Sequence, residues 1–326
     1  MLSLSYAQII NRADWPEGFK TAPVNQAWTD RVLKDANIPD IPPRESGPYI
    51  PSSSDITACN DQDTWAFSYD DGPGDVTVND ALIPLKDRNI KATFYVTGQQ
   101  VAAYPEIVKQ MYDEGHSVGI HSWSHKRLTS LTNAEVIAEV VWTASIIQRV
   151  IGVVPNDVRP PFQDIDERVR ALIQAMGFKI SLWNLDSNDW RYEGYTPGNT
   201  DVRDPAIAIP EAFRNYVNQP RKGTISLQHD LFRASAKQIA PTLDIVRETP
   251  YKFTTVPECA GFPAYGNPLI NEILGLPTTG TNPVVEPGPG PQPDPGSVKQ
   301  QVPPNVSSKP GVVHAVMLLL ILNIFL

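Results

Sequence analysis

The sequence predicts an α/β protein in which parallel strands alternate with helices and close into a barrel. Between residues 64 and 256, short apolar runs alternate with longer segments of helical periodicity. Alternation at this spacing is typical of parallel βαβ units. In addition, polar motifs with reactive side chains follow five of the predicted strands. Because such loops share one rim of a βα barrel, we expect the five motifs to converge on one site.

Apolar runs bounded by turn residues predict the strands and extended segments. In chain order these cover residues 64–69, 92–97, 117–120, 157–161, 178–183, 224–228 and 253–256. Helical periodicity predicts helices over residues 78–89, 101–115, 132–150, 166–176, 210–219 and 235–249. Thr132 and Glu135 match a capping box at the start of the third helix, and Gly115 is placed to end the second. No GxGxxG follows the first strand, which disfavours a dinucleotide-binding fold.

The composition indicates a globular protein that does not bind nucleic acid. The chain has 326 residues, of which 41% are hydrophobic and 19% charged, so a sizeable core can form. The formal net charge of -9 lacks the basic excess that a nucleic-acid partner requires.

The two cysteines, Cys59 and Cys259, flank the region that holds all five motifs. Neither lies in a CxxC pair, so a zinc knuckle is not expected. A disulfide between them would tie the start of this region to its end, and the alternative is two buried free thiols. We favour the disulfide because the C-terminal tail indicates the secretory route.

The C-terminal sequence resembles a signal for a glycosylphosphatidylinositol anchor. Residues 312–326 are almost all apolar, but they are fewer than the roughly 20 residues of a transmembrane helix. They follow a polar, Pro/Gly-rich stretch in which Ser297 and Asn305 are candidate attachment sites. A tail anchor or a packed terminal helix is the alternative. The sequon Asn305-Val306-Ser307 adds a candidate glycosylation site.

The two ends of the chain differ in what they indicate. MLSLSYAQII has no basic residue and little apolar sequence, so it does not match a signal peptide. A truncated start or a partly processed form would reconcile it with a secreted protein. We therefore expect a monomeric, cell-surface or cell-wall protein, anchored to the plasma membrane by lipid.

Four regions follow from these observations. They are an N-terminal extension over residues 1–58, a catalytic domain over 59–262, a linker or stalk over 263–311 and a hydrophobic tail over 312–326.

Two motifs together predict a metal site with one carboxylate left over. Asp70 and Asp71 end the first predicted strand, and successive strand side chains point to opposite faces, so the two can have different roles. His121 and His125 are four residues apart, which on a helical turn places them on one face. One carboxylate and two imidazoles leave an open metal position, which suits hydrolysis. A surface Asp-Asp-Gly-Pro turn and two exposed loop histidines are the alternatives; His116 receives no role.

Three further motifs supply groups for hydrolysis. In the segment Arg159-Pro160-Pro161-Phe162 the prolines lack N–H groups, so the next rigid donor for an oxyanion is the Phe162 backbone. The motif Asp186–Trp190 places a carboxylate beside a large ring. His229 ends a strand and can act as a general acid when a carboxylate orients it. Each motif could instead be a polar cluster at a strand end.

In this order, the motifs SYDDGP, HSWSH, RPPF, DSNDW and ISLQHD resemble those of the NodB-like polysaccharide deacetylases, and RPPFQDIDERV is similar to the fungal chitin deacetylases. The resemblance covers about residues 60–260. It implies a distorted (β/α) barrel of about seven repeats, the NodB-homology fold. Gln163 stands where this family usually has glycine, and Ser68-Tyr69 replaces Thr-Phe.

The resemblance also implies the roles of individual residues. Asp71, His121 and His125 would bind one divalent metal ion, Zn²⁺ or Co²⁺. Asp70 would be the catalytic base, oriented by Arg159, and His229 the catalytic acid, oriented by Asp189. The Phe162 N–H would bind the oxyanion. The substrate contacts would be Trp190 and Leu227, which line the pocket for the acetyl methyl, and Gln163 at its rim.

The implied function is metal-dependent hydrolysis of the N-acetyl groups of chitin, or of N-acetylglucosamine oligomers, during remodelling of the fungal cell wall. The products are chitosan and acetate. Three alternatives remain open: an acetylxylan esterase or peptidoglycan deacetylase with the same residues, an inactive chitin-binding wall protein, and a structural wall protein whose stalk is its main function.

Overall fold

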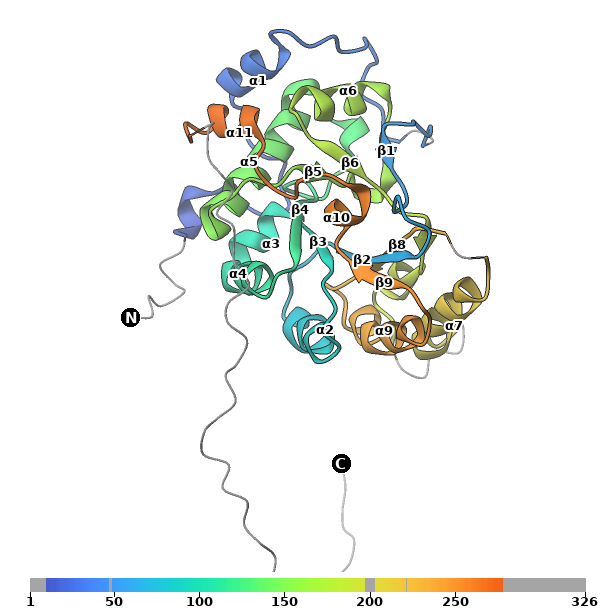
Figure 1. Cartoon of the computed structure of the whole chain (residues 1–326). Coiled ribbons are helices and arrows are strands. Elements are labelled where there is room, and N and C mark those ends of the chain that lie inside the picture. The colour runs from blue at the N-terminus through green and yellow to red at the C-terminus, as the bar shows by residue number, and fades with distance from the viewer. Residues whose placement is uncertain (1–9, 47–48, 197–202, 221, 278–326) are drawn as a thin grey trace, which may run out of the picture. The chain divides into compact units, whose positions relative to one another are not determined.

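The computed structural model describes residues 10–46, 49–196, 203–220 and 222–277 (Figure 1). The predicted anchor tail, the candidate attachment sites Ser297 and Asn305, and the stalk from residue 278 onward lie outside these residues. Within the described ranges, no helix combines the length and the apolar character needed to span a membrane.

All strands of the described residues belong to one sheet, and every pairing between them is parallel. The order is β1-β6-β5-β4-β3-β2-β8-β7, and β9 also pairs with β2. The strands are β1 Asp55–Ile56, β2 Thr64–Asp70, β3 Thr93–Val96, β4 Ser117–Ile120, β5 Asp157–Val158, β6 Lys179–Ser181, β7 Leu185–Asp186, β8 Thr224–His229 and β9 Lys252–Thr254. The predicted parallel α/β class is therefore confirmed.

The sheet curls because β6 and β7, which are close in sequence, lie near opposite ends of the strand order. Only residues 182–184 separate β6 from β7. β6 pairs with β5, whereas β7 pairs with β8. This short connection brings the two sides of the strand order together, so the sheet forms the distorted barrel that the sequence predicts rather than an open sheet.

Helices surround the strands and bury their apolar faces against them (Figure 1). The helices are α1 Gln26–Leu33, α2 Ile83–Asp87, α3 Gly98–Ala103, α4 Pro105–Asp113, α5 Asn133–Ile151, α6 Glu167–Ala175, α7 Pro205–Val217, α8 Arg233–Ala236, α9 Ile239–Arg247, α10 Val256–Ala260 and α11 Pro268–Ile273. Short helical turns are η2 Arg12–Asp14, η3 Val78–Leu82, η4 Leu128–Ser130, η5 Pro161–Gln163 and η6 Asp189–Tyr192. The predicted capping box of Thr132 and Glu135 starts α5.

The helix predicted over residues 101–115 is wrong in one respect. The chain forms two helices there, α3 and α4, which meet at Tyr104. Pro105 has no N–H to continue the α3 hydrogen bonds, but its fixed φ suits the first position of α4.

The folded unit extends beyond the predicted boundaries at residues 58 and 262. β1 lies in the predicted extension, yet it pairs with β6. After residue 262, Tyr265 OH accepts a hydrogen bond from the Val118 N–H at 3.0 Å, and α11 buries Ile270. The predicted start of the stalk at residue 263, which was based on Pro/Gly content, is too early. The apolar residues of 263–277 pack on the barrel.

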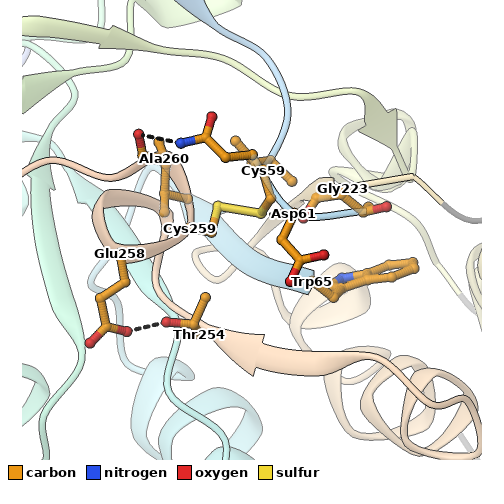
Figure 2. The surroundings of a disulfide bond; sticks show 12 residues. Cys59, Asp61, Trp65, Gly223, Thr254, Glu258, Cys259 and Ala260 are labelled. Carbon is orange, nitrogen blue, oxygen red and sulfur yellow. Dashed lines mark hydrogen bonds between the residues drawn. A yellow bond between two sulfur atoms is a disulfide. The ribbon is translucent and has the colours of Figure 1, made fainter. Parts of the chain in front are cut away.

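Cys59 and Cys259 form a disulfide (Figure 2). Their Cα atoms lie 4.8 Å apart although 200 residues separate them in sequence. The Asn60 backbone N–H donates to the Cys259 carbonyl at 3.0 Å, and its side-chain amide donates to the Ala260 carbonyl at 3.0 Å. The segment before β2 is thus joined to α10.

Candidate metal centre and active site

All five motifs lie at the carboxyl ends of parallel strands of one sheet. Asp70 and His229 are the last residues of β2 and β8, and they are register partners. His121 and Arg159 directly follow β4 and β5, and Asp189 lies just beyond β7. The predicted convergence on one rim follows from this parallel arrangement.

Asp71, His121 and His125 form a cluster that could hold a metal ion. One ligand atom from each lies within 4.8 Å of the others. Asp71 Oδ1 is 3.3 Å from His121 Nε2 and 3.0 Å from His125 Nε2. No donor is aligned with this buried oxygen well enough for a hydrogen bond among the described residues. Two imidazole nitrogens close to one buried carboxylate oxygen fit a divalent cation such as zinc.

The charge state of Asp71 also fits a cation ligand. Burial opposes its ionisation, but the neighbouring His121 and His125 outweigh this effect and hold the pKa of Asp71 well below its usual value. The carboxyl group is therefore ionised.

The two histidines come together in a loop and not on the helical turn that their spacing predicts. Ser122 and His125 have positive φ angles of 62° and 57°, which turn the chain back on itself. The Ser122 hydroxyl accepts a hydrogen bond from the His125 N–H at 3.1 Å. His121 Nδ1 lies 2.6 Å from the Arg159 carbonyl oxygen, so its Nε2 is left for a metal.

Arg159 holds Asp70 beside this cluster. The guanidinium is fully buried, and Nη1 donates to Asp70 Oδ1 at 2.7 Å and to the Ser68 hydroxyl at 2.8 Å. Its other nitrogens donate to the carbonyls of Ser181 and Leu182, at the junction of β6 and β7. The hydrogen bond from Arg159 goes to Oδ1, whereas Asp70 Oδ2 lies 3.7 Å from His121 Nε2. The second oxygen of this carboxylate therefore faces the metal cluster.

His229 and Asp189 form a buried acid pair on the other side. Asp189 Oδ1 lies 2.7 Å from His229 Nδ1, and Oδ2 accepts the His229 backbone N–H at 2.7 Å. Burial opposes protonation of the imidazole, but Asp189, with smaller contributions from Asp71 and Asp70, raises the pKa of His229 to about 10. The imidazole is therefore protonated at neutral pH, and Nε2 is its second N–H.

The Phe162 backbone N–H is available to a ligand. Phe162 and Gln163 have positive φ angles of 59° and 56°, a conformation that non-glycine residues rarely adopt. None of the described residues accepts a hydrogen bond from the Phe162 N–H. The Phe162 ring is 54% exposed and packs on the His125 ring, with their centroids 4.6 Å apart. Phe162 is thus packed against one of the metal histidines.

The other predicted substrate contacts differ in exposure. Leu227 is buried in β8, two residues before His229 and on the same face of the strand. Trp190 is 48% exposed in η6, next to Asp189. An apolar side chain and an exposed ring are therefore carried by the same elements as His229 and Asp189.

Sequence reasoning missed several buried polar residues around the site. Glu139 binds the histidine loop, and Asp157 accepts hydrogen bonds from Tyr95 and Ser181 below Arg159. Asp230 accepts from Thr77. Two signals were available: Glu139 is an acidic residue within the apolar run of α5, and Asp230 ends the motif ISLQHD.

The chain is similar to known proteins in both sequence and fold. The sequence profile of the polysaccharide deacetylase family matches residues 57–181. The structure of peptidoglycan deacetylase PdaC from Bacillus subtilis is 33% identical, with a TM-score of 0.51, and the match covers 61% of this chain and 90% of that one. The chain belongs to the polysaccharide deacetylase family.

Two fungal members of the polysaccharide deacetylase family are also similar. Chitin deacetylase 1 of Cryptococcus neoformans is 35% identical over 221 residues, which are 64% of this chain and 46% of the relative. The chitin deacetylase structure from Colletotrichum lindemuthianum is 26% identical with a TM-score of 0.57, and the match covers 66% of this chain and 96% of that one. The chain spans about half the length of the curated relatives it matches.

Proposed function

We propose that this polysaccharide deacetylase removes the N-acetyl groups of chitin in a metal-dependent hydrolysis. The observation that carries the proposal is the cluster of Asp71, His121 and His125 with the Asp70 carboxylate held free beside it. When bound by these three residues, a divalent cation such as Zn²⁺ or Co²⁺ supplies Lewis-acid chemistry, which polarises a carbonyl and makes water more acidic.

Asp70 acts as the general base. Its Oδ1 is occupied by Arg159, so Oδ2 takes a proton from the attacking water. The water oxygen then forms a bond to the acetyl carbonyl carbon. Because Arg159 is fixed by carbonyls of the β6–β7 junction, the carboxylate keeps one orientation throughout.

The Phe162 N–H stabilises the negative charge that develops on the carbonyl oxygen. A fixed backbone donor of this kind contributes roughly 3–4 kcal/mol to the transition state. The positive φ of Phe162 aims the donor and has its own conformational cost, which the surrounding structure offsets.

His229 acts as the general acid. Its imidazolium gives a proton to the leaving nitrogen as the C–N bond breaks, which releases acetate and leaves a glucosamine unit in the polymer. Leu227 and Trp190 enclose the acetyl methyl, and Gln163 contacts the sugar at the rim.

Chitin is the proposed substrate because the fungal relatives are named chitin deacetylases. The site chemistry would equally serve peptidoglycan or acetylated xylan. We further propose that the protein acts as a monomer at the cell wall and is lipid-anchored. The disulfide and the apolar tail, which lies outside the described residues, support an extracellular location.

The test is acetate release from chitin oligomers, with peptidoglycan and acetylxylan as competing substrates. We expect turnover on chitin that a chelator abolishes and that added zinc or cobalt restores. Asp70→Asn should abolish turnover and retain the metal, whereas His121→Ala should lose both. Near-full activity of Asp70→Asn would contradict the proposed role of the base, and a preference for another polymer would contradict the proposed substrate.

A further inference from the structure

The loop that carries both metal histidines depends on bonds from outside itself. Residues 121–125 form no helix or strand, and two of them have positive φ angles. The carbonyls of Ser122 and Trp123 accept hydrogen bonds from the N–H groups of Gly98 and Gln99, at 3.0 and 3.2 Å. These bonds fix one edge of the loop, at the start of α3.

Glu139 fixes the other edge. Its side chain is completely buried in α5, and one carboxylate oxygen accepts the N–H groups of Trp123 and Ser124, both at 2.8 Å. The second oxygen accepts the Ser124 hydroxyl at 2.8 Å and the Ala22 N–H at 2.9 Å. The carboxylate thus joins the loop between the two metal histidines to a segment more than 100 residues earlier in the chain.

That segment, residues Trp15–Pro23, is here named the N-terminal brace. The Trp15 ring stacks on the buried Trp123 ring with the centroids 6.4 Å apart, and its edge meets Trp142 of α5 at 6.0 Å. Trp142 Nε1 donates to the Pro23 carbonyl at 3.0 Å, and Lys126, the residue after His125, donates to the Thr21 hydroxyl.

The brace lies outside the stretch that the family profile matches, which begins at residue 57. Three of its contacts nevertheless reach the histidine loop or its support, through Trp123, Lys126 and Glu139. A buried carboxylate that loses one of its four donors has an unsatisfied charge, which is costly. The brace and the histidine loop therefore stabilise each other through Glu139.

We propose that the N-terminal brace and Glu139 are positioning elements of the metal centre, which set metal affinity by fixing the loop of His121 and His125. The inference rests on the proposed function in one respect, namely that these histidines bind a divalent cation. The hydrogen bonds of Glu139 go to Ala22, Trp123 and Ser124 and not to a metal ligand, so it acts through the loop between the histidines.

The experiment measures Zn²⁺ affinity of the full chain by competition with a chromophoric chelator. We expect the dissociation constant to rise about 10–100-fold in Glu139→Gln and in Trp15→Ala, the usual effect of removing a group that orients a metal ligand. Trp15→Phe, which retains an aromatic ring, should bind nearly as tightly as the wild type. Excess Zn²⁺ should restore kcat in all three variants, because the catalytic groups are unchanged.

Two controls separate positioning from general stability. Lys20→Ala changes an exposed residue of the brace that is paired with Glu17, and it should keep wild-type affinity. Leu243→Ala in α9 should lower the melting temperature without changing zinc affinity. Wild-type affinity in Glu139→Gln and Trp15→Ala would overturn the proposal. If the wild type bound no zinc, both this proposal and the proposed function would be overturned.

Discussion

Asp189 keeps His229 protonated, and this effect can be measured as a pH profile. In Asp189→Asn the imidazole loses its ionised partner, so its pKa falls from about 10. A general acid works only while it is protonated, so activity is lost as the pH rises through the pKa of His229. The alkaline limb of the kcat profile should therefore move to lower pH in the variant.

The matched control for this prediction is Asp186→Asn. Asp186 belongs to the same motif, but it accepts a hydrogen bond from the Asn188 N–H and none from His229. Its charge acts on His229 only through space, so its alkaline limb should shift less than that of Asp189→Asn. An unchanged limb in Asp189→Asn would mean that another group is the acid.

His116, to which the sequence assigned no role, is a buried neutral imidazole. Its Nδ1 accepts the Ala92 N–H at 3.1 Å, and burial lowers its pKa to about 3. The unfolded chain takes up this proton near pH 6.5 and the folded protein does not, so stability falls as the pH falls below that value. His116→Gln has no imidazole at this position, so it should not show this loss of stability at low pH.

The measurement is urea denaturation of the wild type and His116→Gln at several pH values. The free energy of unfolding of the wild type, relative to that of His116→Gln, should fall by about 2 kcal/mol between pH 7 and pH 5. A constant difference across this range would show that the imidazole is not held neutral.

Site residues that belong to a motif could be predicted from the sequence. Residues whose role depends on tertiary packing could not. Asp71, His121 and His125 are adjacent to strand ends, so their meeting follows from parallel topology. Glu139 and Asp157 lie 14 or more residues from the nearest metal histidine, and their own roles are not marked by any motif. Only the folded structure shows which donors they satisfy.

At the scale of elements, the disulfide joins the chain before β2 to α10 (Figure 2). Replacing both cysteines, Cys59→Ala with Cys259→Ala, frees a loop of 200 residues in the unfolded chain. We expect the free energy of unfolding to fall by about 2–5 kcal/mol, measured by urea denaturation.

Reduction provides the control for the cysteine replacement. A reductant should lower the stability of the wild type by a similar amount and leave the double variant unchanged. Equal stability of the oxidised wild type and the double variant would contradict this account.

Element boundaries follow from sequence only where local chemistry decides them. Thr132 and Glu135 cap α5 as predicted, because a capping box is a local structure. The four-residue spacing of His121 and His125 predicted a helical turn, but tertiary bonds to α3 and α5 impose a loop. Strands of two residues, such as β1 and β7, are too short to produce a periodic pattern.

At the scale of the whole molecule, metal binding should raise thermal stability. Only the folded protein brings Asp71, His121 and His125 together, so a bound cation stabilises the folded state. At a free zinc concentration 100 times the dissociation constant, the gain is about 2.7 kcal/mol. Calorimetry of the metal-free protein should show a higher melting temperature after zinc is added.

His121→Ala should show no such increase, and magnesium should have little effect because it prefers oxygen ligands in octahedral geometry. An equal increase in His121→Ala would place the stabilising ion elsewhere.

The barrel itself was predictable because alternating strands and helices leave few topologies. The extent of the folded unit was not, because residues 263–277 share the Pro/Gly content of the stalk and yet pack on the core through Tyr265 and Ile270.

β2 pairs with β3, β8 and β9, and all of its residues are buried. Its amides should therefore be among the slowest to exchange with deuterium, and the strand that ends in Asp70 should be the last to melt. On warming, the histidine loop, which belongs to no helix or strand, should open while this strand stays intact. Moderate heat should cause inactivation that cooling with zinc reverses, well before the chain aggregates.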